Sequence, residues 1–359
     1  MRTAIGPRNP RRHAHGQAGA PKQEGVSTMG RLPALVALAA LAAAATVTVG
    51  WESLDHASTA AHVGDANAAT SMQIAPPISI EIGGVPTDVE ASPTGVWVAT
   101  GLGGIVRVNP ETNRVVAHIR PGGAITSLAR GLGAIWALDL FGERLLRIDP
   151  RSNRVTSVTR VDSLPSAVAV GHGLVWVASQ LETSVAGIDP RTGRVVKLAL
   201  FARDELWPGG LAVDRNGVWV VTGHGNEVSV FDPETMRFRE RLSMPGARTL
   251  VADGSGAWVG VAGGTTLLRI RHGRVTQAPL GMQNDGYGPS LATAGRVWVA
   301  ARDAVVELDP AHGTVLGRTR LPRGTNAGPI AVDGDVWVVD AERRALVRVG
   351  AYARREVSR

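Results

Sequence analysis

From residue 78 onward, short runs of branched and small apolar residues alternate with polar turns rich in glycine and proline. Such runs indicate β-strands rather than helices. A tryptophan occurs within the same short sequence motif about every 40 residues, which is a period typical of propeller blades. Its seven copies are Trp97, Trp136, Trp176, Trp219, Trp258, Trp298 and Trp337. The pattern predicts an all-β chain that folds as a seven-bladed β-propeller, with each tryptophan packed between neighbouring blades.

Each repeat divides into four short strands, so we expect four-stranded antiparallel blades. In the third repeat these strands are Ser166–Val170, Leu174–Ser179, Ser184–Asp189 and Arg194–Leu200. The last two are joined by an Asp-Pro turn, in which the aspartate accepts backbone N–H groups and a glycine supplies the positive φ. The same turn recurs at Asn109-Pro110, Asp149-Pro150, Asp232-Pro233 and Asp309-Pro310.

The last repeat predicts how the ring closes. No Asp-Pro turn follows Ala345–Val349, whereas Ile78–Ile82 precedes the first repeat and has the character of an outer strand. We therefore expect this N-terminal strand to complete the seventh blade, which removes exposed sheet edges. The alternative is a C-terminal outer strand from Tyr352 onward.

The N-terminal region differs from the repeats. Residues 1–31 form a basic tail that we expect to be disordered, and Met29 is an alternative start. Residues 32–50 are apolar behind Arg31, which predicts a cleaved signal peptide or a single membrane anchor. Both place the propeller outside the cytoplasm, secreted or anchored, and limit membrane contact to this segment. Residues 51–77 read as a linker, 78–350 as the propeller and 351–359 as a tail.

Charge and cysteine content narrow the function. The formal charge is +7, but residues 1–31 carry +5 of it, so the rest carries only +2. A domain so close to neutral lacks the basic surface that nucleic-acid binding requires. The chain has no cysteine, which excludes disulfides, thiolate metal sites and a cysteine nucleophile.

The repeated sequence motifs resemble those of known propeller families. The hairpins Arg147–Val155, Gly187–Val196 and Val230–Arg237, with the W-V-A strand, resemble extracytoplasmic propellers built of YVTN-type repeats and the related virginiamycin B lyase-like group. The resemblance covers about Ile78–Gly350. It implies the propeller fold. The resemblance to the lyase-like group also implies an active site of histidine and glutamate residues with a divalent metal. Such a site abstracts a proton from the substrate and thereby opens a lactone.

Candidate site residues follow from where the repeat is interrupted. The long entry loops Phe201–Gly210 and Gly281–Gly288 predict ligand contacts by the residues Glu205, Trp207, Asn284, Asp285 and Tyr287. The alternative for both loops is ordinary packing. In the light of the resemblance, His224 is the candidate catalytic residue, and the alternative is a surface histidine.

Three aspartates are candidate ligands of a Ca²⁺ or Mg²⁺ ion. Asp88 begins the innermost strand of the first repeat, while Asp139 and Asp340 end the second strands of the second and seventh repeats. These repeats are neighbours in a closed ring, and carboxylate oxygens suit both ions. The alternative is that each aspartate caps its own loop by accepting backbone N–H bonds.

Two functions remain open. The first is an extracytoplasmic binding or scaffold propeller, monomeric, whose channel mouth holds a small molecule, a glycan or a protein segment. The second is a metal-dependent enzyme of the virginiamycin B lyase kind, a lyase or lactonase. A shared fold supports both and decides neither.

Overall fold

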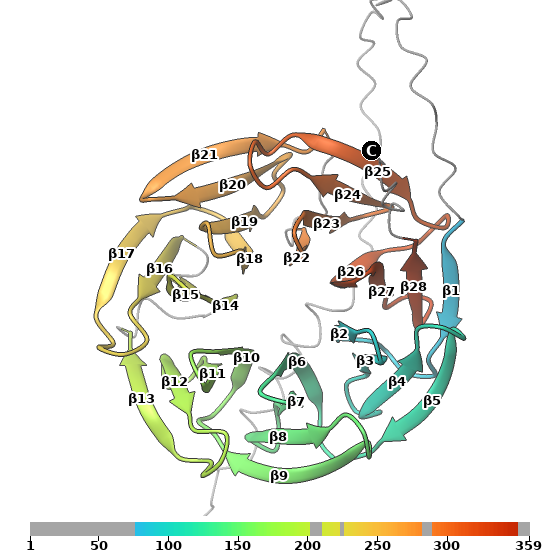
Figure 1. Ribbon diagram of the computed structural model, residues 1–359, viewed down its shortest axis with the longest axis horizontal. Helices are drawn as coiled ribbons and strands as arrows, with labels where there is room; N and C mark the ends of the chain where they lie inside the picture. The colour runs from blue at the N-terminus through green and yellow to red at the C-terminus, as the bar shows by residue number, and fades with distance from the viewer. Residues whose placement is uncertain (1–75, 202–209, 223–225, 282–288, 351–359) are drawn as a thin grey trace, which may run out of the picture. The chain divides into compact units, whose positions relative to one another are not determined.

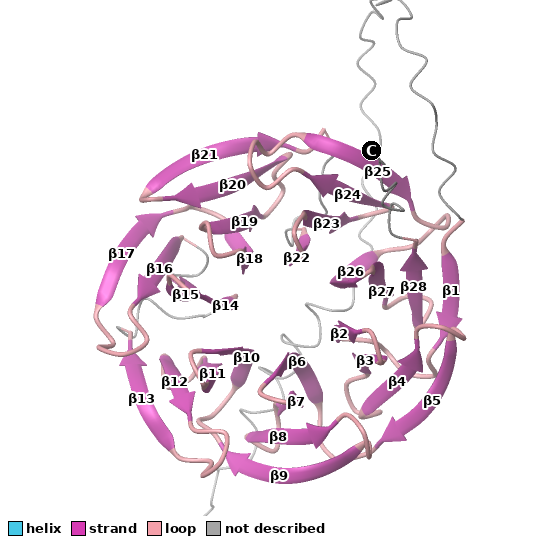
Figure 2. Cartoon of the chain, in the orientation of Figure 1, coloured by secondary structure: helices cyan, strands magenta, loops and turns pink. Residues whose placement is uncertain are grey.

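The computed structural model describes residues 76–201, 210–222, 226–281 and 289–350. These residues form seven antiparallel sheets of four strands each, arranged around a central axis (Figure 1). Strands and loops make up all the described residues (Figure 2). No helix able to span a membrane occurs in that part of the chain. The predicted seven-bladed propeller is confirmed.

Blades 1 to 4 each run outward from an innermost strand in sequence order. Blade 1 comprises β2 (Asp88–Ser92), β3 (Gly95–Ala99), β4 (Ile105–Asn109) and β5 (Arg114–Ile119). Blade 2 comprises β6 (Ile125–Gly131), β7 (Ala134–Asp139), β8 (Arg144–Asp149) and β9 (Arg154–Arg160). Blade 3 comprises β10 (Pro165–Gly171), β11 (Leu174–Ser179), β12 (Ser184–Ile188) and β13 (Val195–Leu200). Blade 4 comprises β14 (Leu211–Asp214), β15 (Gly217–Thr222), β16 (Glu227–Phe231) and β17 (Phe238–Ser243).

Blades 5 and 6 repeat this order, and blade 7 takes its outer strand from the start of the propeller. Blade 5 comprises β18 (Ala247–Ala252), β19 (Ala257–Val261), β20 (Thr266–Arg271) and β21 (Arg274–Pro279). Blade 6 comprises β22 (Ser290–Thr293), β23 (Val297–Ala301), β24 (Ala304–Leu308) and β25 (Val315–Arg320). Blade 7 comprises β26 (Ala327–Asp333), β27 (Asp335–Asp340), β28 (Ala345–Val349) and β1 (Ile78–Glu81).

The ring closes in blade 7, where strands from the two ends of the propeller pair. Strand β1 lies antiparallel to β28, in a register that places Ile78 opposite Arg348 and Glu81 opposite Ala345. The Ile82 amide continues the pairing by donating to the Arg344 carbonyl at 3.2 Å. The alternative outer strand from Tyr352 onward lies outside the described residues.

The core consists of seven apolar clusters, one at each contact between blades, and each holds one repeat tryptophan. None of the seven side chains is more than 6 % exposed. Trp97 of blade 1 packs against Ile125 and Leu128 of blade 2. Trp337 of blade 7 packs against Val89 of blade 1, so the same contact closes the ring. The predicted packing of the tryptophans between blades is confirmed.

Arginines of the third strands strengthen four of these contacts. Each guanidinium lies 5.0–5.9 Å from the centre of a tryptophan ring, in the pairs Arg107–Trp97, Arg147–Trp136, Arg269–Trp258 and Arg348–Trp337. Such cation–π contacts stabilise by about 0.5–2 kcal/mol.

Three of these arginines also reach the next blade. Arg107 donates to the Asn153 Oδ1 atom at 3.0 Å, and Arg269 donates to the Ala311 carbonyl. Arg348 donates to the Pro110 carbonyl at 2.6 Å and to Asn113 Oδ1 at 2.9 Å. The last pair joins blade 7 to blade 1, so these side chains reinforce the closure.

The Asp-Pro turns have the predicted hydrogen bonds. In blade 3, the Asp189 carboxylate accepts the Arg191 amide at 2.8 Å, and Gly193 has a φ of 67°. The positive φ does not require glycine, however, because Asn113 and Asn153 occupy the same position with φ of 55° and 57°. Asparagine tolerates this conformation better than other non-glycine residues.

Removing the closing arginine tests the importance of this contact. We expect Arg348→Ala to lower the free energy of unfolding by roughly 2–3 kcal/mol, because it removes a ring stack and hydrogen bonds to blade 1. Arg147→Ala is the matched control, since Arg147 stacks on Trp136 without a recorded bond from its side chain to the next blade. Urea unfolding followed by circular dichroism measures both. Equal losses in the two variants would contradict the closing role.

Candidate functional site

The innermost strand of blade 1 interrupts a regular pattern around the axis. In each blade one residue of this strand lies directly opposite the repeat tryptophan. In blades 2 to 7 that residue is alanine or valine, namely Ala129, Ala169, Ala212, Val251, Ala292 and Ala331. In blade 1 it is Glu90, opposite Trp97. A glutamate at a position filled elsewhere by a small apolar residue marks this blade as different.

A second acidic residue lies two positions earlier on the same strand. Successive side chains of a strand alternate between its faces, so Asp88 and Glu90 share the face of β2 that meets blade 2. Asp88 Oδ2 accepts the Leu128 amide of β6 at 2.7 Å. The neighbouring Thr87 hydroxyl donates to the Ile125 carbonyl at 2.9 Å. Blade 1 therefore hydrogen-bonds to the free edge of the innermost strand of blade 2.

Burial strongly perturbs both carboxyl groups. Loss of solvation and the negative charge of Asp88 together raise the pKa of Glu90 to about 8, although the Arg130 guanidinium and amide act in the opposite direction. Burial likewise raises the pKa of Asp88 to about 6, although its hydrogen bonds to Leu128 and Val89 oppose the change. At neutral pH the junction therefore holds a protonated Glu90 beside an ionised Asp88. Both side chains keep a small exposed area.

This arrangement has a defined chemical capacity. A protonated carboxyl group donates a hydrogen bond or a proton, and a carboxylate accepts one or holds a cation. Arg130, whose side chain is exposed, adds a fixed positive charge from β6. Strongly shifted pKa values gather at functional sites. The junction between β2 and β6 is therefore the candidate site, with Asp88, Glu90 and Arg130 as its polar groups.

Two of these three residues were missed by the sequence reasoning, which selected only Asp88. Aligning the seven repeats on their tryptophans would have exposed Glu90, because an acidic residue among alanines and valines stands out. Arg130 carries no comparable signal, since arginine is frequent throughout the chain.

Of the three predicted cation ligands, Asp139 and Asp340 serve their own loops. The fully buried Asp139 accepts the Ala124 and Gly142 amides at 2.9 and 3.1 Å and pairs with Arg144. Asp340 is also fully buried. Its carboxylate accepts hydrogen bonds from the backbone amide of Arg343 at 3.2 Å and from the Nη1 atom of the same arginine at 3.1 Å.

These contacts agree with the alternative of loop capping. Across residues 76–350, outside the three undescribed loops, no three acidic or histidine side chains gather as metal ligands. The proposed Ca²⁺ or Mg²⁺ site thus receives no support from the geometry. Asp88 belongs instead to the pair with Glu90.

The remaining predicted site residues lie outside the described residues. They are Glu205, Trp207, His224, Asn284, Asp285 and Tyr287. The strands on either side nevertheless show that the connections 201–210 and 280–289 are longer than the other entry connections, such as 120–124 and 244–246. The predicted contacts of these residues stay predictions.

Comparison with known proteins agrees with the fold. No protein-family model matches the chain, and no curated protein matches its sequence. Among solved structures, streptogramin B lyase superposes with a TM-score of 0.65 at 13 % identity, covering 76 % of this chain and 97 % of the other. Hydrazine synthase from Kuenenia stuttgartiensis superposes with a TM-score of 0.63, also at 13 % identity, covering 76 % and 98 %.

The chain therefore shares the propeller fold of streptogramin B lyase. At this identity the likeness concerns the fold alone, because the two superposed proteins carry different names and functions on the same architecture. The function has to be argued from the site.

The raised pKa of Glu90 predicts a specific dependence of stability on pH. An unfolded glutamate ionises near its ordinary pKa of 4.5, whereas folded Glu90 ionises near 8, so unfolding releases a proton between these values. The free energy of unfolding should fall as the pH rises from 4.5 to 8, and the loss is complete above 8. Glu90→Gln keeps the shape of the neutral side chain and should remove the part of this fall that Glu90 causes, while the smaller fall due to Asp88, complete above its pKa of about 6, remains.

Thermal unfolding of the wild type, Glu90→Gln and Glu111→Gln at pH 5 to 9 measures the effect. Glu111 is an exposed turn residue and serves as the control. We expect the melting temperature of Glu90→Gln, measured relative to that of the wild type, to be several degrees higher at pH 9 than at pH 5. If the difference in melting temperature between Glu90→Gln and the wild type stays constant from pH 5 to 9, Glu90 is not held neutral in the folded protein.

Proposed function

We propose that this chain is an extracytoplasmic binding or scaffold propeller that holds a polar ligand at the junction between blades 1 and 2. The observation that carries the proposal is Glu90, an ionisable residue opposite a repeat tryptophan where six blades have alanine or valine. Burying such a group destabilises a protein unless its charge is paired or neutralised. Its presence is best explained by a role in binding.

The position of the pair agrees with binding at one end of the ring. Asp88 begins β2, so it lies at the end of the blade where the entry connections join. The long connections 201–210 and 280–289 precede the innermost strands of blades 4 and 6 in the same way. Loops on a rigid scaffold are common positions for binding residues.

The polar groups define the class of ligand. Protonated Glu90 donates to oxygen acceptors, Asp88 accepts from hydroxyl or amine groups, and Arg130 attracts an acceptor or an anion. A molecule rich in hydroxyl or amine groups uses all three, which favours a glycan, a small polar molecule or a polar protein segment. The proposed location outside the cytoplasm rests on residues 32–50, and N-terminal sequencing of exported protein tests it.

Calorimetric titration tests the binding function. The probes are neutral oligosaccharides, spermidine and short polar peptides, each titrated at pH 7 into the wild type, Glu90→Ala and Glu111→Gln. We expect at least one probe class to bind the wild type and Glu111→Gln equally. Glu90→Ala should weaken that binding tenfold or more, equivalent to about 1.4 kcal/mol. The proposal fails if no class binds, or if Glu90→Ala binds as the wild type does.

One observation favours a second candidate, a lyase-like enzyme. A protonated and an ionised carboxyl group side by side can act as acid and base on one substrate, Glu90 giving a proton and Asp88 taking one. The described residues supply no metal site, and the candidate His224 lies outside them.

The enzyme candidate predicts turnover of a streptogramin B antibiotic. Chromatography of mixtures with and without Mg²⁺ would follow the ring opening, using the wild type, Glu90→Gln and His224→Ala. An enzyme should convert the antibiotic and lose at least a hundredfold in rate in Glu90→Gln, as expected for removal of an acid–base group. A binding propeller should leave the antibiotic unchanged in all three samples.

A further inference from the structure

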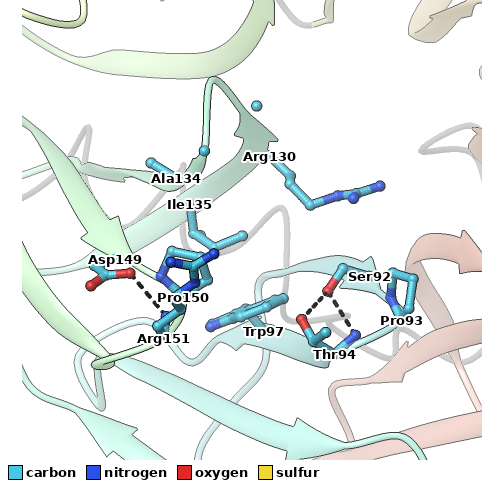
Figure 3. A pocket seen from close by; sticks show the side chains of 12 residues that line it. Ser92, Pro93, Thr94, Trp97, Arg130, Ala134, Ile135, Asp149, Pro150 and Arg151 are labelled. Carbon is cyan, nitrogen blue, oxygen red and sulfur yellow. Dashed lines mark hydrogen bonds between the residues drawn. The ribbon is translucent and has the colours of Figure 1, made fainter.

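A pocket of about 620 Å³ lies between blades 1 and 2, near the turns that follow their innermost strands (Figure 3). Its lining includes Ser92 and Thr94 of the β2–β3 turn, Trp97 of β3, and Arg130 and Arg151 of blade 2. In Figure 3, the Trp97 ring lies between Arg151 and Pro150 at one end and Ser92 and Thr94 at the other. The pocket lies at the opposite end of β2 from Asp88, and it shares Arg130 with the candidate site.

Trp97 has an unpaired hydrogen-bond donor. In blades 2 to 5 each indole N–H donates to the residue five positions earlier, in the pairs Trp136–Gly131, Trp176–Gly171, Trp219–Asp214 and Trp258–Asp253. In blade 1 the corresponding residue is Ser92, whose hydroxyl donates to the Gly95 carbonyl at 3.1 Å. Trp97 Nε1 is buried without a partner, and the side chain is 1 % exposed.

This unpaired donor is held firmly in place. A buried donor without an acceptor destabilises a protein by about 1–3 kcal/mol, so a ring that could turn would find a partner. Arg107 stacks on the Trp97 ring and donates to the Thr94 carbonyl at 2.7 Å and to Asn153 Oδ1 at 3.0 Å. These bonds join the β2–β3 turn of blade 1 to the β8–β9 turn of blade 2 beside the Trp97 ring.

The charges around the pocket are mainly positive. Arg130 and Arg151 both line it with exposed side chains. Asp149 is the acidic residue among the lining residues, and its carboxylate already accepts the Arg151 amide and the Ser152 hydroxyl, each at 2.9 Å. The pocket therefore offers a ligand two exposed guanidinium groups and the apolar surfaces of Pro93 and Pro150, with the indole N–H of the buried Trp97 behind them.

We propose that this pocket binds a small organic anion with a carboxylate or phosphate group and an apolar body. The charged group is held by Arg130 and Arg151, and the indole N–H of Trp97 supplies a further donor once the anion is seated. Guanidinium groups bind both kinds of anion through paired hydrogen bonds. The apolar body packs on Pro93 and Pro150, which line the pocket beside the buried tryptophan. This site goes beyond the proposed function: the two share Arg130, but this one lies at the other end of β2, where Arg151 and Trp97 line the pocket.

The comparable pocket between blades 5 and 6 shows what is specific here. It measures about 370 Å³ and is lined by Arg269, Arg271 and Arg296, but also by Asp253. Asp253 accepts the indole N–H of Trp258 at 3.3 Å, so that donor is already satisfied. Arginine lining therefore occurs in both pockets, whereas of these two only the pocket between blades 1 and 2 has an unpaired indole N–H.

Titration with benzoate and phenyl phosphate tests the site, with benzylamine as the cationic control. We expect both anions to bind with a dissociation constant of about 1 mM or tighter, as suits fragments of this size, and benzylamine not to bind. Arg151→Ala should weaken anion binding at least tenfold. Arg191→Ala, the same turn position in blade 3, should leave it unchanged. Failure of both anions to bind, or equal effects of the two substitutions, would overturn the proposal.

The indole signals provide a readout at the site itself. In ¹⁵N-labelled protein the Trp97 indole resonance, assigned from Trp97→Phe, should move on addition of benzoate, while the Trp176 resonance stays in place. If Trp97→Phe does not fold, the moving resonance is identified as the one that no longer responds in Arg151→Ala. Binding that moves no indole resonance would contradict the role of Trp97.

Discussion

The packing of one tryptophan from each blade into the next is the interaction on which the rest of the structure depends. A single blade is a small twisted sheet that cannot bury its faces alone, so its stability comes from its neighbours. The seven apolar clusters lie at the seven junctions, and Trp337 against Val89 makes the last junction equivalent to the others. Arg348 adds polar contacts at that same junction, which is consistent with the lack of a cysteine to lock the ring.

Because this packing repeats, departures from it are informative. The junction between blades 1 and 2 departs twice along the strand β2. Glu90 replaces the small apolar residue opposite the tryptophan, and Ser92 stands where the residue in blades 2 to 5 accepts the indole N–H. Both changes lower the expected stability of blade 1, since one buries an ionisable group and the other leaves a donor unpaired. Arg130 of β6 lies beside both. We infer that this junction is where the ring was adapted for binding.

Much of the fold was predictable because the signals are local and repeated. The tryptophan period gave the number of blades, and the missing turn after Val349 indicated that Ile78–Ile82 supplies the last strand. The hydrogen bonds of the Asp-Pro turns were predictable for the same reason, since an aspartate reaches its own turn whatever the surrounding fold.

The candidate site was only partly predictable, because it depends on contacts between strands. An alignment on the tryptophans singles out Glu90 but does not show that it lies opposite the ring, because Glu90 is seven residues before Trp97 whereas Ala292 and Ala331 are six residues before their tryptophans. Asp139 suggested a metal ligand from its place at a strand end, yet the nearby Arg144 occupies its carboxylate. A sequence gives such residues without the direction in which their side chains point.

The most direct test of the adapted junction is a ¹³C NMR titration of the Glu90 side-chain carboxyl group in the folded protein. A carboxyl group that is enclosed between β2 and β6 beside Asp88 should titrate with a pKa of about 8. A midpoint near the ordinary value of 4.5 would mean that Glu90 lies in water, which would contradict an enclosed, neutral Glu90 at the junction between blades 1 and 2.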